Sequence, residues 1–574
     1  MISYFKQFLS LCTKKHKTEY FIIVILMLVG TIMELLGIGL IVPIFSLILD
    51  FENFKNYKLL NNYFTFFSKY SYGTVVFLSL SLLVIVFLIK NITLLFISYK
   101  NGKFLNVLKA DIERRLFVKY LNQDYLTYVS KNSSQFVSSI ISEAREYAAN
   151  VILSFLTLTN EILILSAILM LLIYIEPKSA LFILTSIGFV FFLLMRKTKK
   201  IVQKLGEIRL LNEQQRVQKI NEGFNMFKYI KILNLENMFV DYFSVYNEKV
   251  KSAGIIQNVI SQLPRRVMEF FGILILSSLI LFMIYIDLPS VKIIPIIAAF
   301  SVAFYRILPG INQILVALQN LSHGISTMKL ISSDLKEINN INSDKIKEKI
   351  SLEKNILLQD VNFKYPGKKD YIFENINLDI LKGEVIGISG ETGVGKSTLT
   401  DIIMGLVPIN GGLIKLDNKT YKDNKILSSL KIGYVPQNIF LIDDTIEKNI
   451  ILNTQKNSIN KFNDALDISE LNEFIASQEN GAKTLIGENG LKISGGQKQR
   501  IGIARAIYSA PDILILDEAT NGIDINKENK ILKKIISQLS KMTIIIISHK
   551  STTLEYCDKV YEIREKKVVL KKNV

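Results

Sequence analysis

Hydrophobic residues are concentrated in the first 320 positions of the chain, in runs long enough to cross a lipid bilayer. A hydrocarbon core about 30 Å thick requires about 20 apolar residues in a helix. Six runs meet this requirement, at 20–49, 73–99, 149–175, 179–196, 266–286 and 290–320. They predict six transmembrane helices, and the even number places both ends of the membrane domain on the same side.

Two long polar stretches, 100–148 and 197–262, separate these predicted helices. Both are rich in Lys and Arg, and neither contains proline. Positive charge near membrane segments marks the cytosolic side, so both stretches, the N-terminus and the final third of the chain are predicted to be cytosolic. We expect the stretches to be helices that pack on partner helices rather than flexible loops. Only Glu176-Pro177-Lys178 separates the third and fourth runs, which predicts a tight hairpin.

The segment 50–72 follows the first predicted helix on the outer side of the membrane. Its aromatic and aliphatic residues recur every three or four positions, with charged residues between them. This spacing is typical of a short amphipathic helix at the membrane surface. A folded loop is the alternative, and the pattern leaves both open.

Among the ionisable residues within the apolar runs or at their ends, six are singled out. Charges in a bilayer are costly, which makes them functional candidates. At about 1.5 Å per residue, the four cations come near the inner leaflet. They either line a cavity and bind the phosphate of an anionic lipid head group, or extend to cytosolic lipid phosphates and anchor the helices. For the two glutamates a structural pairing is favoured over transport chemistry. The six are Glu34, Lys90, Glu161, Arg265, Arg266 and Arg306.

The composition agrees with a membrane protein. The 574 residues are 49% hydrophobic, the mean hydropathy is +0.31, and Lys and Arg exceed Asp and Glu by 18. Much of that excess flanks apolar runs and no nucleic-acid-binding motif accompanies it, so nucleic acid is not an expected partner. The first apolar run is too long for a signal peptide and is expected to stay in the membrane. Cys12 and Cys557 indicate neither a disulfide framework nor a metal site.

After Ser351, short strand-like runs alternate with turns and helices, as in an α/β domain. The predicted strand Val385–Ser389 leads into a glycine-rich loop and a helix. Glycines there allow backbone N–H groups to surround a phosphate at the helix N-terminus. Lys396 is predicted to reach the β- and γ-phosphates of a nucleotide, and Ser397 to hold Mg²⁺. The predicted phosphate-binding residues are Gly390, Glu391, Thr392, Gly393, Val394, Gly395, Lys396, Ser397 and Thr398.

A second predicted strand, 513–516, ends in two adjacent carboxylates. Its four aliphatic residues deliver Asp517 and Glu518 to the sheet edge where ligands bind in such folds. Asp517 suits Mg²⁺, either directly or through water. Glu518 suits the general base that polarises an attacking water.

Between these motifs, Ser494-Gly495-Gly496-Gln497 precedes another predicted helix. A serine and two glycines before a helix form a further phosphate-binding terminus. One nucleotide does not need two such termini. The second is therefore predicted to serve the nucleotide of another subunit.

The order of these motifs resembles the ATP-binding-cassette (ABC) family, in which two cassettes enclose two ATP molecules head to tail. The resemblance implies ATP and Mg²⁺ as cofactors and a homodimer with composite ATP sites. It implies that Tyr365 stacks on adenine, that Gln437 senses the γ-phosphate and contacts the metal, and that His549 holds the γ-phosphate. Ser494 and Gly496 would contact the ATP of the partner subunit.

The chain departs from the family pattern at two places. Ile493 stands where Leu is usual at the start of the second glycine motif. The interface loop reads Asn521-Gly522-Ile523-Asp524 where Ser-Ala-Leu-Asp is usual, so the family does not fix the geometry of this loop.

Six predicted helices before one cassette resemble the exporter class of this family. The predicted fold class is an α-helical polytopic membrane domain of the exporter type fused to an α/β P-loop nucleotide-binding domain. The predicted limits are 1–330 for the membrane domain with its cytosolic extensions, 331–350 for a linker and 351–574 for the ATPase domain. Two intact hydrolytic sites are expected in the homodimer.

Within that class, the membrane half is most similar to PglK-type flippases of lipid-linked oligosaccharides in bacterial N-glycosylation. Gln313 stands where that family tends to have a second basic residue after Arg306. The resemblance implies a multi-pass protein of the bacterial inner membrane and an anionic substrate with a polyprenyl tail, a pyrophosphate and a glycan. Lys90, Arg265 and Arg306 are the substrate-binding candidates. The similar stretches are Met33-Glu34 through Val42-Pro43, residues 50–72, Pro264-Arg265, and Tyr305-Arg306 with Pro309.

Other functions fit parts of the pattern. A multidrug, lipid or peptide exporter could use the same scaffold and would favour a less cationic cavity. An ATP-gated channel or nucleotide-sensing receptor is disfavoured because the hydrolytic motifs are intact and no regulatory segment is inserted. The six apolar runs exclude a soluble cassette protein.

Overall fold

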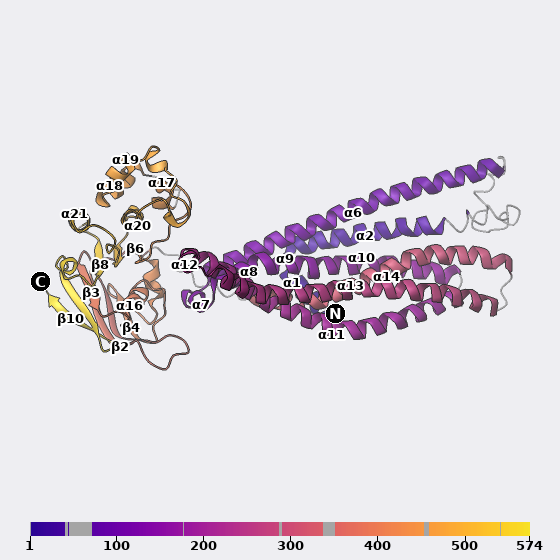
Figure 1. Ribbon diagram of the computed structural model, residues 1–574, viewed down its shortest axis with the longest axis horizontal. Helices are drawn as coiled ribbons and strands as arrows, with labels where there is room; N and C mark the ends of the chain where they lie inside the picture. Colours follow the sequence, from indigo (N-terminus) through magenta and orange to yellow (C-terminus); the bar gives the residue numbers. More distant parts are fainter. Residues whose placement is uncertain are drawn as a thin grey trace. The chain divides into compact units, whose positions relative to one another are not determined.

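The computed structural model describes residues 2–40, 44, 72–175, 177–285, 290–336, 350–452, 458–539 and 541–573. It divides into two compact units (Figure 1). The first comprises Met1–Gln123 and Thr127–Asn342 and is helical. The second comprises Asp124–Leu126 and Ser343–Val574 and carries the β-sheets. The domain limits expected from the sequence, at 330 and 351, stay predictions.

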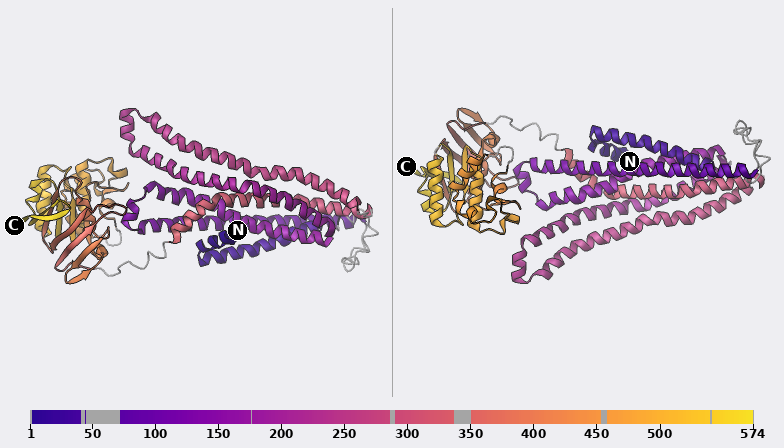
Figure 2. Two further views of the ribbon diagram at one scale, coloured as in Figure 1. Left: turned by 90° about the horizontal axis from the view of Figure 1, so that it is seen from below. Right: turned by 90° about the horizontal axis from the view of Figure 1, so that it is seen from above.

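The helical unit is built from helices that continue well beyond the length of a membrane crossing. Three of them are unbroken over about 50 residues each: α6 (Tyr72–Asn122), α11 (Pro177–Asn225) and α13 (Glu236–Tyr285). Each joins a predicted apolar run to a predicted polar extension, which confirms that the extensions are helical (Figures 1 and 2). α13 continues through Pro264 without a break. Among the described residues before 337, the other helical elements are α1 (Ile2–Leu11), α2 (Lys14–Gly39), α7 (Tyr125–Val129), α8 (Ser133–Ser138), the π-helical turn η1 (Ser139–Glu143), α9 (Ala144–Tyr147), the π-helical turn η2 (Ala148–Ile152), α10 (Leu153–Ile175), α12 (Phe227–Leu233) and α14 (Ser290–Lys336).

Periodic apolar faces pack these helices together. On α11, Ile183, Ile187 and Val190 are buried and recur every three or four positions, which is the spacing of one helix face. α11 packs against α13 and α14, and α10 packs against α14. Where α11 meets α14, a Cβ atom at Gly206 would lie 2.1 Å from the carbonyl oxygen of His323, so only glycine permits this approach.

Five helices of the described residues are long and apolar enough to cross a membrane. They are Lys14–Gly39, Tyr72–Asn122, Ser133–Tyr174, Pro177–Asn225 and Phe300–Leu335. Each overlaps one of the six predicted runs. The remaining run, 266–286, falls at the end of α13, which is not among the five, so six crossings stay a prediction. The predicted amphipathic segment 50–72 lies outside the described residues except for Tyr72, the first residue of α6.

The second unit contains two sheets. A six-stranded sheet has the order β10-β9-β3-β8-β7-β6, and a four-stranded antiparallel sheet has the order β2-β1-β4-β5. The strands are β1 (Asn355–Phe363), β2 (Phe373–Leu381), β3 (Val385–Gly390), β4 (Gly411–Leu416), β5 (Lys419–Tyr421), β6 (Ile432–Val435), β7 (Ile513–Asp517), β8 (Thr543–Ile547), β9 (Lys559–Arg564) and β10 (Lys567–Asn573). The helices are α16 (Lys396–Ile403), η3 (Asn424–Ser429), α17 (Ile446–Ile450), α18 (Ile459–Ile468), α19 (Asn472–Ala476), η5 (Gly481–Lys483), η6 (Glu488–Gly490), α20 (Gly495–Tyr508), α21 (Ile525–Gln538) and α22 (Ser551–Leu554).

The centre of the six-stranded sheet is parallel and buried. β3 pairs with β8, and β8 pairs with β7, all in the same direction. β7 and β8 are buried along their whole length, as expected for aliphatic strands covered on both faces. The carboxyl ends of β3, β7 and β8 therefore meet at one edge, which brings together the loops that follow them.

Candidate functional site

The glycine-rich loop between β3 and α16 adopts a conformation that depends on its glycines. Gly393 and Gly395 have φ angles of 88° and 109°, where residues with a side chain are strained. A Cβ atom at Gly395 would lie 2.9 Å from the ring of Phe373. The first N–H groups of a helix have no acceptor within it, so the start of α16 offers them to an anion. Gly390 ends β3, and Glu391, Thr392 and Val394 complete the loop.

Lys396 is anchored beneath this loop. Its Nζ donates to the carbonyl oxygens of Gly390 (2.9 Å) and Glu391 (3.1 Å) and lies 2.7 Å from Nε2 of His549. Burial lowers the pKa of Lys396 from its usual value. The hydroxyl of Tyr365 lies 3.2 Å from Oγ1 of Thr398, so the predicted adenine-stacking residue stands beside the loop.

The two predicted carboxylates emerge at the end of β7. Asp517 accepts a hydrogen bond from the hydroxyl of Tyr434 over 3.3 Å, and burial raises the pKa of Asp517. Glu518 follows with a φ of 47°. Its Oε2 accepts from Nε2 of Gln437 over 2.7 Å, and its Oε1 lies 2.9 Å from Nε2 of His549. An Nε2 atom carries either a proton or a lone pair, so His549 satisfies Lys396 or Glu518 at any one time, but not both.

These residues converge on one cavity of about 430 Å³. The parallel sheet gathers them because the loops after β3, β7 and β8 end at the same edge. The structure brings these predicted residues to one cavity, and their roles stay predictions. The cavity is lined by Thr392, Gly393, Gly395, Lys396, Ser397, Thr398, Gln437, Asp517, Glu518 and His549.

The second glycine motif caps a different helix. Ser494 is the N-cap of α20: its Oγ accepts from the backbone N–H of Gln497 (3.3 Å), whose Oε1 accepts from the N–H of Ser494 (2.8 Å). This reciprocal pair fixes the start of the helix. Among the residues that line the 430 Å³ cavity, none belongs to Ser494-Gly495-Gly496-Gln497. That separation is compatible with the predicted use of this terminus by a partner subunit.

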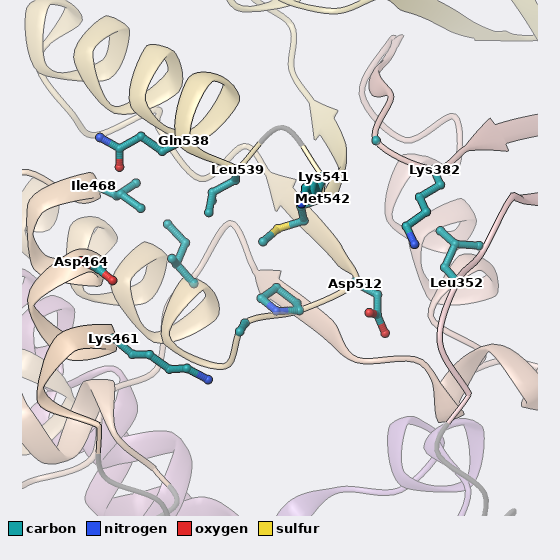
Figure 3. A pocket seen from close by; sticks show the side chains of 14 residues that line it. Leu352, Lys382, Lys461, Asp464, Ile468, Asp512, Gln538, Leu539, Lys541 and Met542 are labelled. Atoms are coloured by element: carbon teal, nitrogen blue, oxygen red, sulfur yellow. The ribbon is translucent and has the colours of Figure 1, made fainter.

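A larger cavity, of about 740 Å³, lies at the opposite edge of the sheet (Figure 3). Lys382, Asp512 and Met542 line it, and each stands just before the start of a central parallel strand. Ligands of parallel α/β sheets bind outside the carboxyl ends of the strands. The smaller cavity, and not this one, is therefore the candidate nucleotide site.

Comparison with known proteins agrees with this geometry. Residues 373–521 match the family model described as "ABC transporter". The whole chain superposes on a bacterial Atm1-family ABC exporter solved with ATP bound, with a TM-score of 0.77 over 97% of this chain and 94% of that one, at 16% sequence identity. The chain therefore has the fold of an ABC exporter, and its second unit carries the ABC transporter family match. It is a multi-pass membrane protein that hydrolyses ATP.

Several curated relatives of this chain carry the name ATP-dependent lipid A-core flippase. The protein from Wigglesworthia glossinidia brevipalpis is 28% identical over 83% of this chain and 81% of its own length. The protein from Pectobacterium atrosepticum is 31% identical, over 50% of this chain and 53% of its own length. The chain thus spans about half the length of this second relative. These names describe the relatives.

The helical unit contains four ionisable side chains joined by ion pairs, here called the charge quartet: Glu34 on α2, Lys90 on α6, Glu161 on α10 and Arg306 on α14. Arg306 Nε lies 2.7 Å from Glu34 Oε1, and Lys90 Nζ lies 2.7 Å from Glu34 Oε2. Arg306 Nη1 and Nη2 lie 3.1 and 3.4 Å from the two oxygens of Glu161. The two carboxylates are only 6% and 3% exposed. Two positive and two negative charges thus link four helices.

A glycine provides the space for this cluster. A Cβ atom at Gly310 would lie 2.9 Å from Glu161 Oε2 and 3.4 Å from Arg306 Nη1. The third substrate candidate, Arg265, is not in contact with the quartet among the described residues. It is 68% exposed, pairs with Glu269 over 3.0 Å, and lines a cavity of about 380 Å³ with residues that include Tyr305 and Gln313. The structure therefore brings Lys90 and Arg306 together and leaves Arg265 apart.

Three residues of the ATP site gave no usable signal in the sequence. Tyr434 bonds to Asp517, and Asn521 donates from Nδ2 to Glu518 Oε2 over 3.1 Å. Asp401 is half-buried on α16, where burial and the nearby Asp517 raise its pKa to about 6. Asn521 was visible only as a departure from the family pattern.

Asp401→Asn is expected to stabilise the chain at neutral pH and to flatten its pH dependence. Asp401 has a pKa of about 6 in the folded chain and 3.8 in the reference state, so between these values the folded chain binds more protons. Stability therefore falls as the pH rises through this window and stays low above it. The substitution should add about 1 kcal/mol near pH 7.5, after allowance for the solvent that reaches this half-buried group. Thermal unfolding of both full-length proteins near pH 5 and pH 7.5 measures the difference. If the substitution raised the stability equally at both pH values, the titration of Asp401 would not be the cause of the gain.

Proposed function

We propose that this chain is an ABC half-transporter that flips a polyprenyl-pyrophosphate-linked oligosaccharide across the bacterial inner membrane, as a homodimer with composite ATP sites. The observation that carries the proposal is the charge quartet, together with the exposed Arg265. Buried charge in a membrane helix bundle marks the path of a polar substrate or ion. A head group with phosphates, a hydrophilic glycan and an apolar tail matches cations placed within apolar helices.

In this proposal the ATP site uses groups that line the 430 Å³ cavity. The loop 390–398 binds the phosphates, with Lys396 directed to the β- and γ-phosphates and His549 to the γ-phosphate. Ser397, Gln437 and Asp517 would supply the oxygen ligands that Mg²⁺ prefers, and the bound ion would neutralise charge on the phosphates. Glu518 accepts the proton of the attacking water. Tyr365 stacks on adenine, and Ser494-Gly495-Gly496-Gln497 of one protomer completes the site of the other.

The quartet defines how an anionic head group would bind. Both cations already have carboxylate partners, so a phosphate has to replace a carboxylate at Arg306 instead of meeting a free cation. Glu161 offers its two oxygens to the two terminal nitrogens of Arg306, the same planar geometry that phosphate uses with arginine. Arg265 needs no such exchange with a buried group, because its only described carboxylate partner, Glu269, is 49% exposed. Arg265 is therefore placed to contact the head group first.

A different anionic lipid is the second candidate substrate. One relative that aligns over most of this chain is named as a lipid A-core flippase, and the quartet would serve any lipid with a phosphorylated head group. Multidrug, simple-lipid and peptide export on the same scaffold remain the alternatives, and they do not require buried cations. Transport of each labelled substrate class separates these functions.

The combination Arg306→Gln with Glu161→Gln is expected to lower transport about 10-fold or more while basal ATP hydrolysis stays within about threefold. The pair removes one charge of each sign, so the net charge of the quartet is unchanged and the bundle is not left with an unpaired ion. Transport is measured in proteoliposomes with a radiolabelled polyprenyl-pyrophosphate oligosaccharide, and ATP hydrolysis in the same vesicles.

The exposed pair Lys231 and Glu236, which lie 2.9 Å apart, provides a matched control. Replacing both by glutamine should change neither quantity. Equal loss of transport and hydrolysis in the quartet variant would contradict a head-group role for Arg306. If the wild-type chain hydrolyses ATP but moves no oligosaccharide lipid, the cargo is a different one and labelled lipid A-core becomes the next substrate.

A further inference from the structure

Asn521 places its side chain on the carboxylate of Glu518. Its Nδ2 donates to Oε2 over 3.1 Å, and its backbone N–H donates to the carbonyl oxygen of Glu518 over 3.2 Å, which closes a turn between the two residues. The positive φ of Glu518, 47°, sends the chain into this turn directly after β7. We propose that Asn521 is a positioning residue that holds the Glu518 carboxylate in the orientation used for ATP hydrolysis. The proposal rests on the proposed role of Glu518 as the general base and is independent of the transported substrate.

The two oxygens of the Glu518 carboxylate have different partners. Oε2 accepts from the side-chain amides of Gln437 (2.7 Å) and Asn521 (3.1 Å), whereas Oε1 faces His549 at 2.9 Å. Two amide donors fix Oε2, which leaves Oε1 as the oxygen that accepts a proton from water. A carboxylate held by one donor could rotate and exchange its two oxygens.

Asn521 differs from Gln437 and His549, the other two partners of the Glu518 carboxylate, because it has no proposed contact with the nucleotide. Gln437 and His549 both have proposed duties toward the γ-phosphate, so each has a second group to contact when nucleotide binds. Asn521 has no such duty, and its bond to Glu518 need not change at that step. Among the described contacts of the carboxylate, it is the one suited to hold the base throughout the cycle.

The residues next to Asn521 keep its side chain in place. The N–H of Gly522 donates to Oε1 of Gln499 on α20 over 2.8 Å. A Cβ atom on Gly496 would lie only 2.9 Å from the carbonyl oxygen of Gly522, so the loop packs directly on the start of α20. Ile523, the residue after Gly522, is 7% exposed and anchors the loop in the core. A serine, the usual residue at position 521, lacks the amide nitrogen and the bond that carries it.

The test is the rate of ATP hydrolysis by full-length Asn521→Ala and Asn521→Asp in proteoliposomes, as a function of Mg·ATP concentration and pH. Asn521→Ala should lower kcat about 10-fold and leave KM for ATP within about twofold, because orientation of the base acts on the chemical step. Asn521→Asp keeps the shape, removes the N–H donor and adds a like charge. Its kcat should fall further, and the acid limb of its pH profile should move to higher pH by about one unit.

Two further comparisons separate this role from a general effect on the loop. Asn526→Ala, at an exposed position at the start of α21, should behave as wild type. In a Glu518→Gln background, Asn521→Ala should cause no further loss, because a residue that acts through Glu518 has nothing left to position. Three results would each overturn the proposal. The first is a wild-type kcat in both Asn521 variants, the second is a loss of activity that appears as a raised KM, and the third is an additive loss in the double variant. Wild-type turnover by Glu518→Gln alone would remove the proposed base itself, an outcome distinct from failure of the Asn521 variants.

Discussion

Glu518→Gln is expected to retain ATP binding and to hydrolyse ATP at least about 100-fold more slowly than the wild-type chain. A glutamine has the same shape, and its carbonyl oxygen can still accept from Gln437 and Asn521, so the local structure persists. The amide cannot take the proton of the attacking water. Phosphate release under saturating Mg·ATP measures the loss, and binding of a fluorescent ATP analogue measures the affinity.

The exposed Glu479 of the same unit serves as the control for this substitution. Glu479→Gln removes the same charge at a residue that does not line the 430 Å³ cavity, and it should leave both quantities unchanged. Hydrolysis near the wild-type rate in Glu518→Gln would exclude this residue as the base. Parallel loss of affinity and turnover would instead indicate that the carboxylate supports nucleotide binding.

Arg306→Ala is expected to destabilise the helical unit, because it leaves the carboxylate of Glu161 without its cation. Glu34 keeps Lys90 at 2.7 Å, whereas the remaining described partner of Glu161 is the side-chain amide of Asn160 at 3.0 Å. Breaking a buried ion pair by removing one partner costs about 3–5 kcal/mol, since an unpaired charge stays buried. The apparent unfolding temperature should fall by several degrees. A thiol-reactive dye reports this unfolding, because Cys12 and Cys557 are both buried in the folded chain.

Adding Glu161→Gln to Arg306→Ala should restore most of the lost stability, because the second substitution removes the unpaired charge. Arg265→Ala is the matched control: this arginine is 68% exposed and its ion pair is solvated, so its loss should cost less than about 1 kcal/mol. If Arg306→Ala and Arg265→Ala unfold at the same temperature, the quartet contributes no more than a surface pair.

The ATP site could be predicted from the sequence because its parts are locally encoded. Gly393 and Gly395 reveal a loop with positive φ, and the aliphatic strand before Asp517 shows where that carboxylate emerges. Parallel strands then bring their carboxyl ends to one edge without further information. The same logic gave the long helical extensions, since uninterrupted polar stretches without proline favour helix. Each of these features depends on residues that lie close together in the sequence.

The charge quartet required the structure. Arg306 bonds to residues 272 and 145 positions earlier in the chain, and no local pattern specifies which helix faces which. The depth of each charge could be estimated from the sequence, and a structural pairing of the glutamates was favoured, but the partners could not be named. Asn521 was hidden for another reason: its contact depends on the turn that starts at Glu518, and the family pattern has a different residue there.

Pro264 gives α13 a mechanical property that its continuous ribbon does not reveal. Proline has no N–H to donate to the carbonyl oxygen of Ile260, and its ring presses on that carbonyl, so the helix resists bending least at this turn. The polar arm before it is about 40 Å long and the apolar arm after it about 30 Å long, at 1.5 Å per residue. The helix therefore behaves as two stiff segments that can bend relative to each other at Pro264, at the edge of the predicted membrane segment. A small swing of the polar arm turns the side chains just beyond the joint, and the first two of these are Arg265 and Arg266.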